Sequence, residues 1–410
     1  MPAEGPDGHD ALSETGGVTT QQSLHRAARR THTFTESVIR EMTRVAKEHD
    51  AVNLAQGMPD FAAPEILKEA ATAAIRADVN QYAITWGAPS LRRALARKYG
   101  AFYGMHVDPE REITVTCGAT EAMAAVMLAL VDPGDEVIIL EPFYENYGPD
   151  AILCAAKPVF LTLEAPEYRL ERDQLQALVT SRTKAIALNT PNNPMGRVFD
   201  RAELQMVADL CVEHDLVAIT DEIYEHILYR GEHIPLATLP GMADRTVTVS
   251  GLSKTFSITG WRVGTIVAPS DLTDAIRKVH DFLTVGSPAP LQEACAVGID
   301  RLGHEYYASL ATSYGERGEI LLAALRASGF RCQAPEGAYY ILADFCALSD
   351  EDDTTFAKRL AREAGVASVP GSSFFSVPER GAGLVRFAFC KKLDTLREAG
   401  ERLKRFADGV

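Results

Sequence analysis

The stretch around Lys254 combines residue types that could bind an anion and attack a carbonyl. Strand-forming residues 246–249 end in small residues, Lys254 comes next, and Arg262 follows eight positions later. Small residues let an anion approach backbone amides, and an arginine can grip it bidentately. A lysine amine out of water and beside a cation has a lowered pKa and can attack a carbonyl. This chemistry suits an aldehyde cofactor that carries a phosphate, such as pyridoxal phosphate. A lone lysine after a strand is more often a solvated surface residue. Whether Lys254 belongs to a cofactor site therefore depends on the residues at the other strand ends.

Short β-branched runs alternate with longer helical patterns between residues 62 and 300. This alternation predicts an α/β fold, with a mostly parallel sheet covered by helices on both faces. The predicted strands are 112–116, 136–140, 184–188, 216–220 and 246–249, and the helices between them include 121–130, 201–214 and 271–282. Because open α/β sheets bind ligands beyond the carboxyl ends of their strands, each strand end is a candidate part of one site.

The length of 410 residues exceeds what a single hydrophobic core usually supports, so two domains are expected. Residues 1–24 are rich in Gly, Ser, Thr and acidic residues and are predicted to form a disordered tail. Residues 25–61 are expected to form an N-terminal arm that packs with the small domain. We assign 62–300 to a large domain and 301–410 to a smaller α+β domain, with strands at 339–342 and 384–389 and helices at 306–328, 354–363 and 392–406.

Two strand ends carry groups that could bind a phosphate or stack on a ring. Small residues 117–122 follow the first strand and open a helix, whose N-terminus exposes amides that favour an anion. The string 141–147 after the second strand holds aromatic residues that could stack on a planar ring. Taken alone, both patterns are weak signals, because the first also fits an ordinary strand–helix turn and buried core aromatics are the commoner explanation of the second.

Polar side chains follow the next two strands. Residues 189–196, Asn-Thr-Pro-Asn-Asn-Pro-Met-Gly, form a loop that two prolines hold rigid. Asp221 and Tyr224 follow the fourth strand. A carboxylate at the end of a buried strand needs a partner, and a protonated pyridine nitrogen would be one. The simpler explanation is a helix-capping aspartate. Five successive strand ends nevertheless supply every group that pyridoxal phosphate requires, which favours one cofactor site.

Composition excludes several classes of protein. The net charge of −15 argues against a nucleic-acid or anionic-membrane partner. Seven scattered cysteines without a CxxC pair fit reduced thiols in a cytoplasm. No His/Cys cluster predicts a metal site, and neither a signal peptide nor a membrane span is recognisable. A cytoplasmic protein with small-molecule substrates is expected.

With these residues in view, the chain resembles the class I and II aminotransferases, pyridoxal-phosphate enzymes of fold type I. It is most similar to the branch of kynurenine–glutamine (cysteine conjugate) and methionine aminotransferases. The similarity covers residues 36–406, and its most specific strings are NTPNNPMGRVF, TDEIYEHILY and SKTFSITGWRVG. The resemblance implies a three-layer large domain with a mostly parallel central sheet, a smaller α+β domain, and ping-pong transfer of an α-amino group to a 2-oxo acid.

The resemblance also implies roles for individual residues. Lys254 would form the Schiff base and shuttle protons, Asp221 would pair with the pyridine nitrogen, and Tyr224 would bind the phenolic oxygen. The other implied cofactor contacts are Gly118, Ala119, Thr120, Tyr144, Asn193, Ser253, Arg262 and, from a neighbouring subunit, Tyr82. The implied substrate contacts are Gly57, Asn189, Asn193 and Arg386. Tyr82 in this role implies a homodimer with shared active sites.

The substrate is less specified. Val285 and Gly286 stand where kynurenine-specific relatives place an aromatic residue and a histidine, and Ile39 replaces an aromatic residue. These differences favour a medium-sized apolar or sulfur-containing amino acid over an aromatic one. Lyases such as carbon–sulfur β-lyases share the scaffold and stay an alternative. A non-enzymatic aminotransferase-like regulator fits less well, because about 35 residues before the match are too few for a DNA-binding module. A dinucleotide-binding dehydrogenase is poorly supported, because no GxGxxG motif follows a predicted strand.

Overall fold

A computed structural model describes residues 26–409 of the protein. The chain divides into two compact units at residue 35, and each is described by itself. In the first, residues 29–32 form a short 3-10 helix, η1 (Arg29–His32). All other elements belong to the second unit. The predicted tail, residues 1–24, lies outside the described residues.

A seven-stranded sheet forms the centre of the second unit. Its strand order is β2-β8-β7-β6-β5-β3-β4, and the four pairs from β7 to β4 are parallel while β8 runs antiparallel to both neighbours. The mostly parallel sheet predicted from the sequence is therefore confirmed. The strands are β2 (Ile113–Thr116), β3 (Glu136–Glu141), β4 (Lys157–Thr162), β5 (Thr183–Asn189), β6 (Val217–Asp221), β7 (Thr246–Gly251) and β8 (Gly264–Val267).

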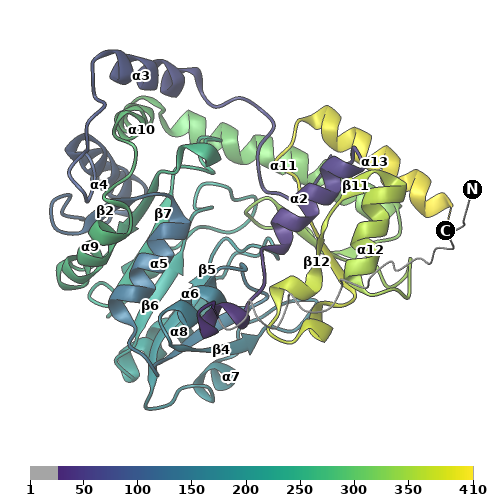
Figure 1. Ribbon diagram of the computed structural model, residues 1–410, viewed down its shortest axis with the longest axis horizontal. Helices are drawn as coiled ribbons and strands as arrows, with labels where there is room; N and C mark the ends of the chain where they lie inside the picture. The colour runs from purple at the N-terminus through teal and green to yellow at the C-terminus, as the bar shows by residue number, and fades with distance from the viewer. Residues whose placement is uncertain (1–25, 410) are drawn as a thin grey trace, which may run out of the picture. The chain divides into compact units, whose positions relative to one another are not determined.

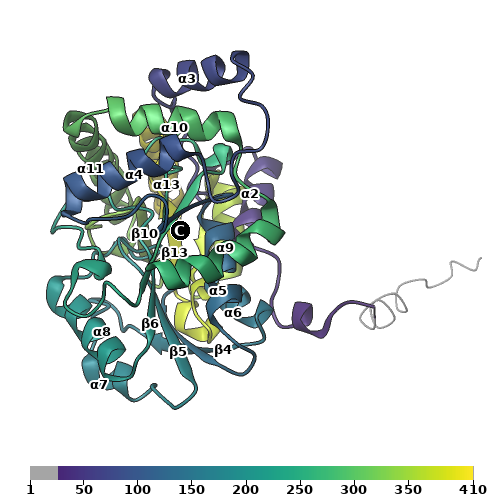
Figure 2. The same ribbon diagram turned by 90° about the vertical axis from the view of Figure 1, so that its left-hand side faces the viewer.

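Alternate residues of the central strands enter two different hydrophobic cores, because side chains in a strand point to opposite faces. Ile139 packs with helices α5 (Ala119–Leu130) and α6 (Tyr147–Leu153). Its neighbour Ile138 packs on the other face with α8 (Arg201–Glu213). Figure 2 shows these helices on the two sides of the sheet, which gives the three-layer arrangement that the resemblance implies. The remaining helices of this region are α3 (Glu65–Arg76), α4 (Pro89–Tyr103), α7 (Arg172–Gln176), α9 (Ser270–Thr284) and α10 (Ala289–Arg301).

The C-terminal part builds a second, antiparallel sheet of order β12-β13-β10-β9. Figure 1 shows it in yellow-green with the C-terminal helices around it. Residues near the N-terminus join this region, because β1 (Val52–Asn53) pairs in parallel with β11 (Val366–Ala367). The other elements are α2 (Val38–Glu48), β9 (Arg331–Cys332), β10 (Tyr340–Asp344), β12 (Val369–Pro370), β13 (Leu384–Ala388), α11 (His304–Ala327), α12 (Asp353–Arg359) and α13 (Leu393–Asp408).

Short helical turns complete the second unit. These are η2 (Leu236–Thr238), η3 (Thr259–Trp261), the π-helical turn η4 (Leu360–Ala364), η5 (Gly371–Phe374) and η6 (Pro378–Gly381). No helix within the described residues is both long and apolar enough to cross a membrane.

Candidate active site

The predicted site residues follow strands whose carboxyl ends meet at one edge of the large sheet. Strands β3, β5, β6 and β7 are parallel, and β2 has the same direction because β8 is antiparallel to both β2 and β7. The register places Asn189 beside Asp221 at the ends of β5 and β6. The topology alone therefore brings together residues that are up to about 135 positions apart in the sequence.

Asp221 ends β6 as a buried carboxyl group. The Tyr147 hydroxyl donates a hydrogen bond of 2.7 Å to Oδ2, and the Ile223 backbone N–H donates one of 3.2 Å to Oδ1. Burial raises the pKa of Asp221 above its usual value, although both hydrogen bonds and the charge of Lys254 oppose this effect. The side chain is 7% exposed and would hold its negative charge better with a cation beside it.

Lys254 is partly exposed in the tight loop after β7. Loss of hydration lowers the pKa of its amine from 10.5 to about 8, and the charges of Arg262 and Arg386 act in the same direction. The amine lies 5.8 Å from the centre of the Tyr339 ring. A larger fraction of this lysine is therefore neutral near pH 7 than of a solvated lysine, and only the neutral amine is a nucleophile or base.

Arg386 lies on β13, in the second sheet, and is fully buried. Its Nη1 donates a 2.8 Å hydrogen bond to Asn193 Oδ1, and its Nη2 donates one of 2.6 Å to the Ala55 carbonyl. The Tyr340 ring lies 4.4 Å from the guanidinium carbon. Its Nε has no hydrogen-bond partner within the described residues. A buried, unpaired guanidinium N–H is costly, which identifies Arg386 as a group ready to bind an anion.

The asparagine loop holds Asn193 in place. Asn189 donates from Nδ2 to the Asp221 carbonyl (2.8 Å), and its Oδ1 accepts from the Asn193 backbone N–H (2.7 Å). Both polar atoms of Asn189 are thus used to join β5, β6 and the loop. Because the Asn193 side-chain oxygen accepts from Arg386, its amide nitrogen is the side-chain atom that can donate to a ligand.

Tyrosine rings line this region. The Tyr224 and Tyr340 hydroxyls lie 3.0 Å apart, and Tyr339 donates a 3.0 Å hydrogen bond to the Gly57 carbonyl. A Cβ on Gly57 would lie 2.1 Å from the Tyr340 hydroxyl, so only glycine lets the chain pass here. The Tyr144 ring contacts Tyr147 edge to face with centroids 5.9 Å apart.

The start of α5 forms a cradle together with Arg262. Gly118 precedes the helix with φ +84°, and an added Cβ would lie 2.1 Å from Arg262 Nη2. Arg262 itself has a left-handed φ of 57°, directly after η3, and its Nη2 donates to the Cys117 carbonyl at 3.4 Å. The first amides of a helix have no intrahelical acceptor, so those at Ala119 and Thr120 can bind an anion beside this guanidinium. Ser253 is buried in the loop that carries Lys254.

Tyr82 is the predicted site residue that these interactions do not include. Tyr82 is 87% exposed, whereas the other predicted residues lie at the edge of the large sheet, in the cradle or, for Arg386 and Gly57, on or beside the second sheet. Sequence reasoning in turn missed Tyr147 and Tyr340, whose roles depend on contacts that span 74 and 116 residues. A signal for Tyr147 was present, because it closes the aromatic string 141–147 after β3.

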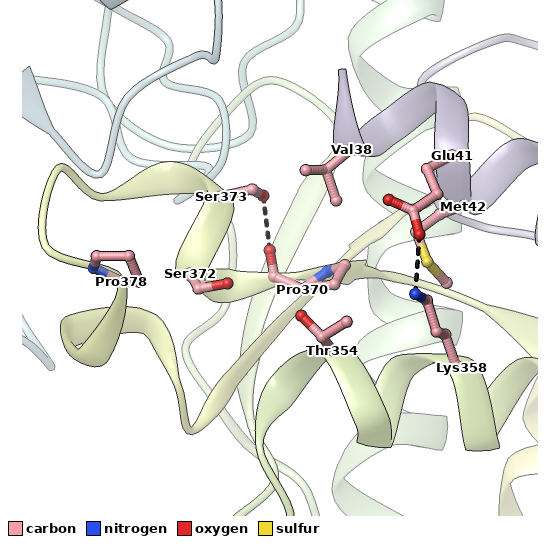
Figure 3. A pocket seen from close by; sticks show the side chains of 9 residues that line it. All are labelled: Val38, Glu41, Met42, Thr354, Lys358, Pro370, Ser372, Ser373 and Pro378. Carbon is pink, nitrogen blue, oxygen red and sulfur yellow. Dashed lines mark hydrogen bonds and ion pairs between the residues drawn. The ribbon is translucent and has the colours of Figure 1, made fainter. Parts of the chain in front are cut away.

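A separate pocket of about 160 Å³ lies between α2, α12 and the η5–η6 region (Figure 3). Glu41 and Lys358 form a 2.8 Å ion pair at its wall. None of the predicted site residues line it, so this pocket is distinct from the candidate active site. No cluster of three or more metal-ligating side chains occurs within residues 26–409.

Comparison with known proteins is consistent with this site. Residues 49–403 match the family model described as aminotransferase class I and II. The chain is 39% identical to a probable N-succinyldiaminopimelate aminotransferase of Mycobacterium tuberculosis, over 92% of this chain and 97% of that protein. It is 38% identical to a methionine aminotransferase of Escherichia coli (90% and 95%) and 36% identical to human kynurenine–oxoglutarate transaminase 1 (89% and 94%).

Solved structures of aminotransferases also match the chain over most of its length. The N-succinyldiaminopimelate aminotransferase of Mycobacterium tuberculosis matches with a TM-score of 0.90 and 39% identity, over 93% of this chain and all of that one. The aspartate aminotransferase of Thermus thermophilus with maleate matches with a TM-score of 0.87 and 34% identity, over 93% and 99%.

Proposed function

Since the chain belongs to the class I and II aminotransferases, which are pyridoxal-phosphate-dependent enzymes, we propose that the residues at its sheet edge form the active site of a transaminase for a medium-sized apolar or sulfur-containing amino acid. The observation that carries this proposal is Arg386, which is fully buried and whose Nε has no hydrogen-bond partner among residues 26–409. A carboxylate is the partner that a planar guanidinium binds best, and both amino acids and 2-oxo acids carry one.

The residues present fit the cofactor. Gly118 leaves room at the start of α5 where a Cβ would collide with Arg262, so a phosphate can approach the amides of Ala119 and Thr120. The buried carboxyl of Asp221 needs a cation, and a protonated pyridine nitrogen supplies one. We assign Lys254 as the covalent anchor, because its amine has a lowered pKa. The further contacts that we propose are Tyr144, Asn193, Tyr224 and Ser253.

Different side chains of the protein serve substrate binding and proton transfer. When bound, pyridoxal phosphate supplies an aldehyde that condenses with amines and a ring that takes up the electrons of a broken C–H bond. Arg386 holds the substrate carboxylate, and Asn193, Asn189 and Gly57 shape that end of the site. With the cofactor and an amino acid bound, Lys254 Nζ would accept the α-proton as a general base. The Asp221 carboxylate would hold the pyridine nitrogen of the cofactor in its protonated form.

We further propose a homodimer in which Tyr82 completes the neighbouring active site. Tyr82 is 87% exposed, and Phe282, at the end of α9, is 91% exposed. Burial of these two large side chains against a second copy would remove apolar surface from water, which favours association. Cytoplasmic location is part of the proposal and is supported by seven free thiols. We also retain residues 62–300 and 301–410 as the large and small domains, with residues 25–61 as the N-terminal arm.

Half-reactions with a panel of amino acids test the proposed donor. Methionine and leucine are expected to discharge the visible absorbance of the cofactor-loaded enzyme faster than kynurenine, because Val285, Gly286 and Ile39 offer no aromatic stacking partner. The similarity to a methionine aminotransferase supports this order. A faster response to kynurenine or to N-succinyldiaminopimelate would refute it. Release of pyruvate, ammonia and a thiol from a cysteine conjugate, without amino transfer, would instead establish a lyase.

A further inference from the structure

His280 near the end of α9 is buried between two acceptors, and the Thr284 hydroxyl lies 3.4 Å from its Nδ1. Its side chain has no exposed surface. Nε2 lies 2.8 Å from the Thr85 carbonyl oxygen, and Nδ1 lies 3.0 Å from Glu121 Oε1. A carbonyl and an ionised carboxylate can only accept hydrogen bonds. Both contacts are therefore hydrogen bonds only when both ring nitrogens carry a proton, which makes His280 an imidazolium.

The groups around His280 support that charge. Burial lowers the pKa of the imidazole, but the hydrogen bond and charge of Glu121 on α5, the Thr85 carbonyl and the charge of Asp281 outweigh burial, so the pKa is raised above 6.5. The nearby Cys117 thiol has a raised pKa, chiefly because of burial, and stays neutral. The hydrogen-bonding partners on α5 and in the segment at residue 85 therefore favour the same protonation state.

Glu121 connects the His280 imidazolium to the phosphate cradle. Glu121 Oε2 accepts a 3.0 Å hydrogen bond from the backbone N–H of Cys117, the residue directly before Gly118. The Cys117 carbonyl in turn accepts from Arg262, and its thiol contacts the Gly286 carbonyl at 3.3 Å. On the other side of the ring, Thr85 lies three residues after Tyr82.

We propose that His280 is a positioning residue whose charged form ties the segment at residue 85 to the start of α5 and so holds the phosphate cradle in its binding conformation. The assignment of a phosphate to this cradle rests on the proposed function. The tie itself rests on the two acceptors that face the buried ring. When His280 loses one proton, one of its ring nitrogens becomes an acceptor that faces another acceptor, so either the Glu121 contact or the Thr85 contact becomes repulsive.

The sign of the pH dependence follows. A histidine whose pKa is raised on folding contributes stability that is fully present below 6.5 and is lost as the pH rises through the pKa of the folded protein. Cofactor affinity is expected to fall over the same interval, by about tenfold, the value of one charge-assisted hydrogen bond.

The matched variant is Glu121→Gln. A glutamine can donate from its amide nitrogen to a neutral His280 Nδ1 while its oxygen still accepts from the Cys117 N–H. The variant therefore keeps the geometry without needing the charge. We expect E121Q to lose the fall in cofactor affinity above the His280 pKa, and we expect the pKa of His280 to drop below its wild-type value.

The experiment has two readouts. NMR titration of ¹⁵N-histidine in the cofactor-free protein reports the His280 pKa, with His280→Gln assigning its signal. Equilibrium dialysis against pyridoxal phosphate over the same pH values reports affinity. A wild-type pKa at or below 6.5 would overturn the proposal, even if E121Q fails to fold. An unchanged affinity profile in a folded E121Q would overturn it as well. Because the titration needs no cofactor, its result is independent of whether the transaminase assignment holds.

Discussion

The reactivity of Lys254 gives the most quantitative prediction. Its pKa of about 8, against 10.5 for a solvated lysine, corresponds to ~3 kcal/mol in favour of the neutral amine. At pH 7 about one Lys254 in ten is then neutral, compared with about three in ten thousand for a lysine of the usual pKa. At pH 7 the neutral, nucleophilic amine is therefore about 300 times more abundant for Lys254 than for a solvated lysine. Its reaction with the cofactor aldehyde should be faster by about this factor.

The assay is the rate at which cofactor-free enzyme gains visible absorbance on mixing with pyridoxal phosphate, measured as a function of pH. We expect the rate to rise about tenfold per pH unit below 8 and to level off near 8. Nα-acetyl-lysine, treated identically, corrects for ionisation of the cofactor itself, and Lys254→Ala gives the baseline. A rate that keeps rising to about pH 10 would refute the reasoning, because the amine would then behave as a solvated lysine.

Three further predictions concern binding and stability. Arg386→Lys keeps the charge but loses the planar fork, so kcat/KM for amino acids should fall by about a hundredfold in steady-state assays, and a fall under threefold would contradict the assignment. Gly118→Ala should weaken pyridoxal phosphate binding, measured by dialysis, because its Cβ meets Arg262 at 2.1 Å and φ is +84°; unchanged affinity would show that the cradle lies elsewhere. Glu225→Ala leaves Lys98 buried without its 2.5 Å partner and should cost about 3–5 kcal/mol in denaturant unfolding, whereas a cost below 1 kcal/mol would show that water reaches the pair.

Much of the fold was predictable because its signals are local. The five strands predicted for the large sheet all occur, and each differs from its predicted bounds by one or two residues. Strands β4 and β8 were not predicted. Strand β8 has four residues and follows a string of candidate site residues, so neither its length nor its composition separates it from a loop. Its antiparallel insertion between β2 and β7 depends on tertiary pairing that no local pattern encodes.

The candidate site was predictable to the extent that parallel strands place their carboxyl ends together. Asp221 and Asn189 follow from that rule. The hydrogen bond from Arg386 on β13 to Asn193 in the loop after β5 joins residues 193 positions apart, and only the resemblance to a family could suggest it. Ser250, near the end of β7, donates to Glu225 at 2.8 Å, a contact that no local pattern of the sequence indicates.

Chemical mapping of the anchoring lysine tests the central claim most directly. The cofactor-loaded enzyme is reduced with borohydride, digested and analysed by mass spectrometry. The proposed site predicts a single phosphopyridoxyl group on the peptide that contains Lys254, and no label in the Lys254→Ala variant. A label on another lysine, or an unlabelled Lys254 in an active enzyme, would contradict the account.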